Sequence, residues 1–368
     1  MSELFCRLGD IFDFKNGRAF KKEEWATSGL PIIRIQNLNN LSASFNYFNG
    51  EYDKSIEVNF GDLLFSWSGT VGTSFGPHIW SRDKGLLNQH IYKLKFKKDI
   101  NVRYAHYALL SITSDIEKSV VGAVGLVHVT KKSLNEFKIS LPDLKTQQKI
   151  VEKLDEIFAE IDRAVWATEA NIKNVEALFK TYLTEVFEVG RSKNDLYNIG
   201  SFLKLEYGKG LDESDRAKNG AYPVYGANGI KSKTNKFLFD EPSIIVGRKG
   251  SAGELTLVFE KFWPLDVTYY VTHDKDKTDI QYLYYGLLAQ NLPQYAKGVK
   301  PGINRNDVYG LKMRLPALNE QKQLALTLTA LSEKVNSLLT VYKTKIETLS
   351  FMKKSILLQA FNGELFKE

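Results

Sequence analysis

The sequence predicts an α+β protein with two globular segments, each a curved β-sheet with helices, separated by two long helices that form an antiparallel coiled coil. A stretch of about 45 positions occurs twice, at a constant offset of 174 residues. Apolar residues recur every three or four positions along both copies. The segments before each copy contain short runs rich in Ile, Val, Phe and Tyr, punctuated by Gly and Asn. We therefore expect four parts, at residues 1–142, 143–190, 191–316 and 317–368.

The repeat is clearest where each long helix is expected to begin. The stretch ISLPDLKTQQKIVEKLDEIF, residues 139–158, returns as MRLPALNEQKQLALTLTALS, residues 313–332. Adding 174 carries Gln147 onto Gln321, and the same offset holds to the ends of both copies without a gap. Chance does not produce such a match, so the chain is expected to contain the same strand exit, Leu-Pro turn and helix twice.

Both copies have the spacing of a coiled-coil seam. Each Leu-Pro suits the turn before a helix, and no Pro or Gly follows before Gly190 or Gly363. A long helix with an apolar stripe needs a partner along its length, and its own duplicate is available. The alternative is that each helix packs separately on its own domain. The predicted interface comprises Ile150, Leu154, Ile157, Ile161, Leu324, Leu328, Leu331 and Val335, and Thr168 and Lys353 interrupt the seam.

The two globular segments repeat more faintly. LGDIFDFKNGRAF parallels IGSFLKLEYGKGL, LPIIRIQNLNN parallels YPVYGANGIKS, and DLLFSWSGTVG parallels SIIVGRKGSAG. LNQHIYKL parallels LDVTYYVT, and VHVTKKSLNEFKISLP parallels PGINRNDVYGLKMRLP. The short apolar runs predict strands, and residues 101–112 and 279–290 predict one amphipathic helix in each segment.

Composition and charge exclude several classes of protein. The single cysteine, Cys6, excludes an intramolecular disulfide and a thiolate metal cluster. No long apolar run or signal peptide is present, so we expect a cytoplasmic protein without a membrane contact. Of the net charge of +7, residues 1–142 carry +4 and residues 191–316 carry +5, whereas residues 143–190 carry −4. Two basic segments suit two contacts with one polyanion, although charges of this size also arise by scatter.

The sequence contains no recognisable catalytic motif. It lacks a dinucleotide-binding Gly-x-Gly-x-x-Gly after a strand, a phosphate-binding Gly-Lys-Ser/Thr and an Asn/Asp-Pro-Pro-aromatic tetrapeptide. Glu136-Phe137-Lys138 imitates part of a nuclease motif, but its nearest Pro-Asp lies downstream, which favours an ordinary strand. The five histidines show no metal-ligand spacing. We therefore expect no catalytic residues, bound cofactor or metal in this chain.

The remaining polar residues are of the types that contact DNA from loops on a rigid sheet. In the first segment the candidates are Lys15, Asn16, Arg18, Lys21, Arg34, Gln36, Asn37, Trp67, Ser68, Thr130, Lys131 and Lys132. In the second they are Lys209, Tyr225, Asn228, Arg248, Lys249, Lys300, Asn304 and Arg305. GRKGSAG places two cations between glycines after a predicted strand, and its alternative is a solvated hairpin. SWSGTVG has an aromatic residue at the matching place, so the two segments are expected to read different sequences.

The order globular–helix–globular–helix, the LPxLxxQxxI start of each helix and the closing SILLQAFNGEL resemble the specificity subunit of type I restriction–modification systems. The resemblance covers essentially the whole chain. It implies that each globular segment is a target recognition domain reading one half of a split double-stranded DNA sequence. It also implies that the helices set the spacing of the half-sites and dock two methyltransferase subunits, which bind S-adenosylmethionine and methylate adenine.

The same resemblance implies motor–nuclease subunits that add ATP-dependent restriction, with ATP and Mg bound in those partners. Two alternatives stay open at this point. One is a coiled-coil scaffold whose sheet domains bind proteins, and the other is an orphan relative that binds DNA without active partners.

Overall fold

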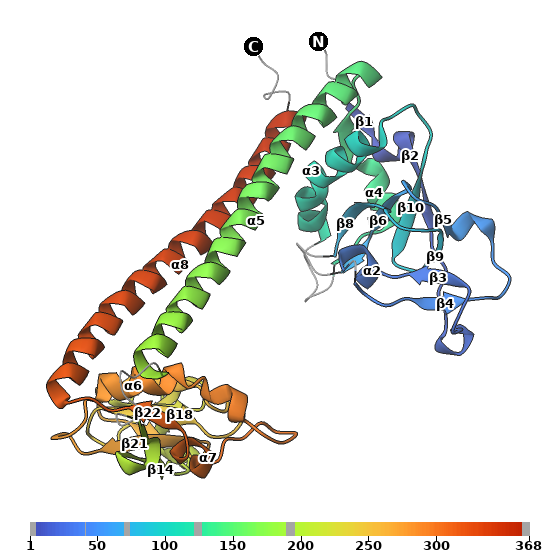
Figure 1. Ribbon diagram of the computed structural model, residues 1–368. Helices are drawn as coiled ribbons and strands as arrows, with labels where there is room; N and C mark the ends of the chain where they lie inside the picture. The colour runs from blue at the N-terminus through green and yellow to red at the C-terminus, as the bar shows by residue number, and fades with distance from the viewer. Residues whose placement is uncertain (1–4, 41, 70–73, 121–126, 189–195, 363–368) are drawn as a thin grey trace. The chain divides into compact units, whose positions relative to one another are not determined.

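The computed structural model describes residues 5–40, 42–69, 74–120, 127–188 and 196–362 of the chain (Figure 1). These residues form two compact units. Unit 1 comprises residues 1–166 and 346–368, and unit 2 comprises residues 167–345. Each unit therefore combines one globular segment with parts of both long helices.

Unit 1 contains two four-stranded sheets, in the orders β2-β10-β6-β8 and β4-β3-β9-β5, and the strand pairs β1-β12 and β7-β11. Its strands are β1 (Phe5–Arg7), β2 (Phe12–Asn16), β3 (Leu30–Ile33), β4 (Asn46–Phe48), β5 (Glu57–Val58), β6 (Leu63–Ser66), β7 (Ser68–Gly69), β8 (Gly76–Ile79), β9 (Gly85–Leu87), β10 (Ile91–Phe96), β11 (Val127–His128) and β12 (Lys138–Ser140). Its shorter helices are α1 (Leu8–Ile11), α2 (Ile35–Asn39), α3 (Val102–Val120) and α4 (Lys131–Glu136), with 3-10 turns η1 (Lys22–Glu24) and η2 (Lys54–Ile56).

Unit 2 contains the sheets β14-β21-β18-β19 and β15-β17-β16-β20 and the pair β13-β22. Its strands are β13 (Leu196–Asn198), β14 (Leu203–Tyr207), β15 (Arg216–Ala217), β16 (Tyr222–Gly226), β17 (Gly229–Thr234), β18 (Ser243–Gly247), β19 (Leu255–Val258), β20 (Trp263–Pro264), β21 (Thr268–His273) and β22 (Lys312–Arg314). Its shorter helices are α6 (Ile280–Ala289) and α7 (Arg305–Tyr309), with 3-10 turns η4 (Ile199–Ser201), η5 (Glu213–Asp215) and η6 (Leu292–Tyr295).

The internal repeat extends to sheet topology. The sheet β2-β10-β6-β8 and the sheet β14-β21-β18-β19 have the same order and the same antiparallel pairings. In the second sheet of each unit one parallel pair is also shared, β3 with β9 and β16 with β20. The units differ after the first of these strands, where unit 1 continues into α2 and unit 2 turns into the hairpin strand β17. The predicted α+β fold is therefore confirmed.

Strand register corrects the sequence alignment by one residue. LNQHIYKL and LDVTYYVT, aligned as written, match Tyr92 with Tyr270. In the sheets Tyr92 lies opposite Asn16, and Tyr269 lies opposite Tyr207, so Tyr92 corresponds to Tyr269. Two adjacent tyrosines give no signal for which one faces the core, whereas the hydrogen-bonded ladder fixes the choice.

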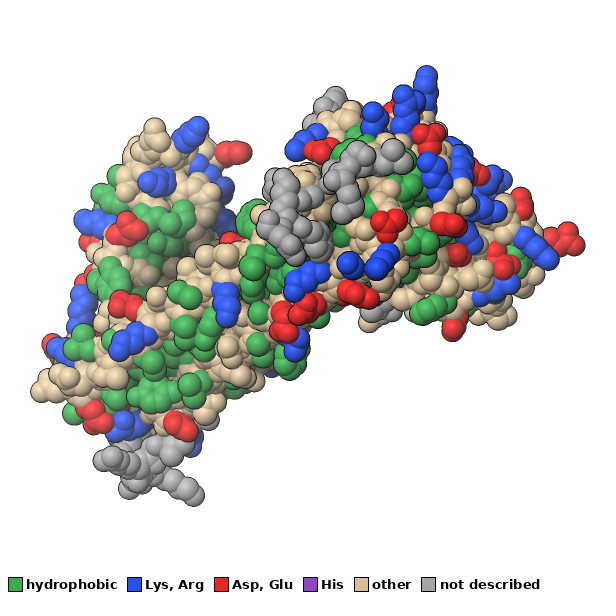
Figure 2. Space-filling view, turned by 90° about the horizontal axis from the view of Figure 1, so that it is seen from above, with side chains coloured by type: hydrophobic (Ala, Val, Ile, Leu, Met, Phe, Trp, Pro, Cys, Tyr) green, Lys and Arg blue, Asp and Glu red, His purple; other side chains and the backbone are tan. Residues whose placement is uncertain are grey.

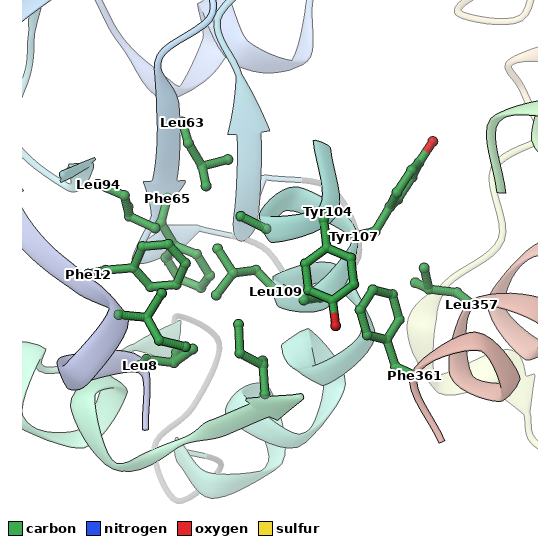
Figure 3. Packing of buried hydrophobic residues seen from close by; sticks show 14 of the residues in the cluster. Leu8, Phe12, Leu63, Phe65, Leu94, Tyr104, Tyr107, Leu109, Leu357 and Phe361 are labelled. Carbon is green, nitrogen blue, oxygen red and sulfur yellow. The ribbon is translucent and has the colours of Figure 1, made fainter. Parts of the chain in front are cut away.

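The core of unit 1 joins its main sheet to α3 and to the end of the C-terminal helix (Figure 3). Phe12 and Phe65 come from the sheet, and Tyr104 comes from α3. Leu357 and Phe361 belong to the same core, and the Phe361 ring lies 5.2 Å from that of Tyr104. The last turns of the chain's final helix are therefore part of the hydrophobic core of the N-terminal segment.

The two long helices are α5 (Leu144–Glu188) and α8 (Leu318–Phe361), close to the predicted 143–190 and 317–368. The start of α5 and the end of α8 share the core of unit 1, whereas the end of α5 and the start of α8 share the core of unit 2. The helices consequently run in opposite directions, as predicted. Of the predicted interface, Ile150, Leu154, Ile161 and Leu328 are buried, and Ile157, Leu324, Leu331 and Val335 are half-buried.

The repeated glutamine explains why the helix start is the best-preserved part of the duplication. Gln147 is buried and donates to the Pro142 carbonyl at 2.8 Å, while its own carbonyl accepts from the Asn101 N–H at 2.8 Å. Gln321 is also buried and makes equivalent bonds to the Pro316 carbonyl at 2.8 Å and from the Asp279 N–H at 3.0 Å. In both units one side chain thus fastens the long helix to the turn before it and to the helix start of α3 or α6.

Candidate nucleic-acid interface

In unit 2, three loops bring predicted contact residues together beside the end of β14. The loop after β18 and the segment before α7 are joined by backbone hydrogen bonds: Ile303 N–H donates to the Arg248 carbonyl at 3.0 Å, and Gly250 N–H donates to the Pro301 carbonyl at 3.0 Å. Lys249 forms a single bridge with Gly302. Asn304 then caps α7 by accepting from the Asn306 N–H at 2.9 Å. These bonds hold Arg248, Lys249 and Arg305 on neighbouring backbone segments.

Tyr207 is the centre of this cluster. The Arg248 guanidinium lies 5.3 Å from the centroid of the Tyr207 ring, and the Arg305 guanidinium lies 5.1 Å from it. Cation–π attraction of this kind orders two flexible side chains that carry the same charge. Neither arginine has a carboxylate within 4 Å among the described residues, and the buried Nε of Arg248 has no hydrogen-bond partner there. Two ordered, uncompensated guanidinium groups form a site for an electronegative ligand.

A glycine lets the strand end approach the neighbouring strand in both units. A Cβ on Gly208 would lie 2.1 Å from the Leu265 carbonyl oxygen, and a Cβ on Gly17 would lie 2.1 Å from the Asn88 carbonyl oxygen. The residue before each glycine, Tyr207 or Asn16, is thereby held at the same edge of its sheet. This equivalence identifies the corresponding site in unit 1.

In unit 1 the equivalent cluster is built around an indole ring rather than a guanidinium. Trp67 stacks on Tyr92 at 5.7 Å and donates through Nε1 to the Asn16 side chain at 3.3 Å. The Val129 N–H donates to the Trp67 carbonyl at 3.2 Å, just before Thr130 caps α4. Residues 70–73 of the predicted SWSGTVG loop lie outside the described residues.

The cations of this second cluster are largely compensated. Lys15 and Lys131 lie 2.9 and 3.0 Å from the two carboxylate oxygens of Asp13, and their hydrogen bonds lower the pKa of Asp13 to about 2. Arg18 pairs with Glu24 and lies 4.9 Å from the centroid of the Phe20 ring. The two clusters therefore occupy equivalent places and differ in charge.

Three predicted contact residues are corrected by their burial. Asn37 is 1% exposed, and its amide donates to the carbonyls of Ala43 and Ser44 at 3.3 and 3.1 Å. Tyr225 is 6% exposed and packs edge-on against Phe262 at 5.9 Å. Ser68 is buried too. These side chains hold the fold together and are not available to a ligand.

The other predicted residues lie on the surface but are spread more widely. Arg34 and Gln36 lie at and in α2, with Arg34 placed 5.7 Å from the Trp25 ring centroid. Lys132 is exposed next to Lys131, and Lys209 follows Gly208. The remaining exposed candidates are Lys21, Asn228 and Lys300, all in loops or turns. In the view of Figure 2, Lys and Arg side chains are interspersed with Asp and Glu, so charge alone does not mark the interface.

Sequence reasoning missed Tyr207. The signal was present, because the internal alignment pairs Tyr207 with Asn16, which was among the candidates. Within the described part of the chain no group of three or more His, Cys, Asp and Glu side chains could hold a metal ion. No helix among those described is long and apolar enough to span a membrane.

Two copies of one sheet fold, each with aromatic and hydrogen-bonding side chains at the same edge, define a duplicated binding protein of the kind that contacts nucleic acids. Comparison with known families agrees with this class. Residues 4–172 and 191–348 each match the type I restriction modification DNA specificity domain. The chain belongs to this family and carries two copies of its domain.

Relatives resemble the chain over most of its length. The EcoprrI specificity subunit of Escherichia coli is 22% identical over 92% of this chain and 90% of that subunit. The MjaVIII specificity subunit of Methanocaldococcus jannaschii is 24% identical over 98% of this chain and 92% of that subunit. The EcoBI specificity subunit of Escherichia coli is 28% identical, but the match takes in 49% of this chain and 37% of that subunit.

Solved structures share the fold. A chain from a study of complex assembly and conformational transition of the type I R-M system superposes with a TM-score of 0.80, at 16% identity over 99% of both chains. The HsdS subunit from Thermoanaerobacter tengcongensis superposes with a TM-score of 0.56, at 16% identity over 98% of this chain and 97% of that one.

Proposed function

We propose that this chain is the sequence-specific DNA-binding subunit of a type I restriction–modification enzyme, in which each unit reads one half of a bipartite duplex target. The observation that carries the proposal is the pair of arginines on Tyr207, an ordered cationic site without an acidic partner among the described residues. Arg side chains read guanine edges in the major groove, and aromatic rings hold such side chains in place. Trp67 and Asn16 at the equivalent place favour a different half-site for unit 1.

We also propose that the chain has no catalytic site and that methyltransferase subunits bind its long helices. Leu178 on α5 and Met352 on α8 are related by the 174-residue offset, and they are 71% and 49% exposed. Exposed apolar side chains at equivalent positions of two repeats suit two copies of one partner. In this assembly S-adenosylmethionine is bound by the methyltransferase subunits, and ATP and Mg by motor–nuclease subunits.

Exchanging one recognition segment tests the proposal. Residues 191–316 would be replaced by the corresponding segment of a relative, and the chimera would be expressed with the methyltransferase subunit. Because the two clusters are built from separate residues, methylome sequencing is expected to show one half-site changed and the other retained. Change in both half-sites would refute independent reading. Methylation by the purified chain alone would refute a non-catalytic role, and partner binding without DNA binding would favour a scaffold.

A further inference from the structure

A second group of cations in unit 2 lies on the β15–β17 ribbon, outside the Tyr207 cluster. Arg216 and Lys218 come from β15 and the residue after it, and Lys231 and Lys233 come from β17. All four side chains are exposed, and they line one concavity of about 410 Å³ together with Ala217, Ile230 and Ser232. Strand pairing sets their arrangement, because Ala217 lies opposite Lys233.

These four cations differ from other cations of the same unit in having no carboxylate within 4 Å among the described residues. Lys236 pairs with Asp215 at 2.8 Å, Lys275 pairs with Glu241 at 2.7 Å, and Lys277 pairs with Asp274 at 2.8 Å. Four uncompensated positive charges in one concavity repel one another, and a polyanion relieves that repulsion.

The ribbon begins next to the Tyr207 cluster. The turn that joins β16 to β17 includes Ala227, and a Cβ on Gly247 would lie 2.9 Å from the Ala227 carbonyl oxygen. Gly247 directly precedes Arg248. From this turn, β17 carries Lys231 and then Lys233 progressively away from Arg248 along the chain.

Lys231 is also held in place by its neighbour. A Cβ on Gly226 would lie 2.8 Å from both Cγ and Cε of Lys231, so the glycine leaves room for the aliphatic stem of this lysine. Its ammonium group is thereby carried along β16 rather than left to move freely.

We propose that the β15–β17 ribbon binds the phosphate backbone of duplex DNA beside the half-site that unit 2 reads. This inference rests on the proposed function and adds a contact of a different kind. Lys231 and Lys233 are two residues apart on a strand, which separates them by about 6.7 Å. One DNA strand carries a charge every 3.4 Å or so along the axis, so the two lysines match about two phosphate steps. The polyanion is DNA rather than an acidic protein because the ribbon continues directly from the base-reading cluster.

The test measures the binding of the full chain to a duplex as a function of salt concentration. Each lysine that neutralises a phosphate contributes about 0.9 to the slope of log K against log salt. Lys231→Gln with Lys233→Gln is expected to lower the slope by about 1.8. The methylated sequence, determined with the methyltransferase subunit present, is expected to stay the same because backbone contacts carry no sequence information.

The matched control removes two compensated lysines from the same unit. Lys275→Gln with Lys277→Gln changes the net charge equally and is expected to leave the slope nearly unchanged. Equal slopes for the ribbon variant and the wild-type chain would overturn the ribbon site alone. A changed methylated sequence would also overturn it, by making the lysines base readers. A wild-type chain that binds no duplex at low salt would overturn both this inference and the proposed function.

Discussion

Arg248 and Trp67 occupy the same place in two copies of one fold, directly after equivalent strands. Arg248 lies near Tyr207 with no carboxylate partner among the described residues, whereas Trp67 stacks on Tyr92 and holds Asn16. A guanidinium offers a fixed set of donors, and an indole offers a flat apolar face with one donor. The backbone frame is therefore common to both units, and the chemistry presented by this position is not.

The first prediction concerns Arg248. Arg248→Ala is expected to weaken specific binding by about 1–3 kcal/mol, the range of one bidentate base contact, and Arg248→Lys should not restore it because lysine lacks the planar donor fork. Competition between specific and unrelated duplexes measures the difference. Lys249→Ala serves as the comparison, since an exposed phosphate contact should weaken both duplexes alike. If Arg248→Ala weakens both alike, the residue binds phosphate rather than a base.

A second prediction concerns two histidines of unit 1. Burial, opposed by hydrogen bonding, lowers the pKa of His78 to about 4, and burial together with the charges of His78 and Arg103 lowers the pKa of His106 to about 4. Both folded-state values lie below the ordinary value of 6.5, so the unfolded chain takes up protons first. Stability is therefore complete above pH 6.5 and is lost as the pH falls from 6.5 towards 4.

Between pH 6.5 and pH 5 each histidine should cost about 2 kcal/mol of unfolding free energy. His106→Gln is expected to remove about half of this loss, which urea unfolding at the two pH values measures. His273 is the comparison, because its pKa is lowered less and it lies in unit 2. An unchanged pH dependence in His106→Gln would show that this side chain stays neutral for another reason.

The limits of sequence reasoning are clearest at single residues. Asn37 and Tyr225 have the right chemistry for DNA contact, but their side chains point into the protein. Strand and loop patterns locate a polar residue near a loop without saying which way it faces. The β15–β17 lysines were missed for a related reason, because a cation within a strand attracts less attention than one between glycines.

At the scale of elements, the long helices were predictable because two copies supported each other. Gln147 and Gln321 stood out as equivalent, and the structure gives both the same hydrogen bonds. Lys353 stood out as an interruption of the seam. Its Nζ donates to both Asp162 carboxylate oxygens at 2.7 and 2.8 Å and lies 5.0 Å from the Phe158 ring centroid. A polar residue in such a seam favours one register of the two helices over others.

The third prediction concerns partner binding by these helices. Leu178→Asp and Met352→Asp should each weaken one of two methyltransferase contacts by about 2 kcal/mol or more, since a carboxylate would be buried without a partner. Native mass spectrometry is expected to show one bound methyltransferase subunit for each single variant and none for the double variant. Asn171→Asp, on an exposed position of α5, is the control. Two bound subunits in both single variants would place the docking surface elsewhere.

At the scale of the whole molecule, each unit is completed by helix segments from distant parts of the chain. Unit 1 needs the end of α8, including Leu357 and Phe361, and unit 2 needs the end of α5, including Leu183 and Phe187. The boundary between the units crosses both helices, at Trp166 in α5 and at Lys345 in α8. Neither recognition segment is therefore separable from the helices, although the bases each one reads are set by its own loops.

The last prediction treats the two helices as a ruler between the half-sites. Four residues would be inserted after Ala167 in α5 and four after Lys345 in α8, so that both helices lengthen by about 6 Å while nearly keeping the phase of their apolar seam. At about 3.4 Å for each base pair, this corresponds to one or two additional base pairs. Methylome sequencing is expected to show both half-sites unchanged and the non-specific spacer between them longer. A control that replaces residues at the same places without insertion should keep the original spacer. An active insertion variant that also keeps the original spacer would show that the helices bind partners without setting the distance on DNA.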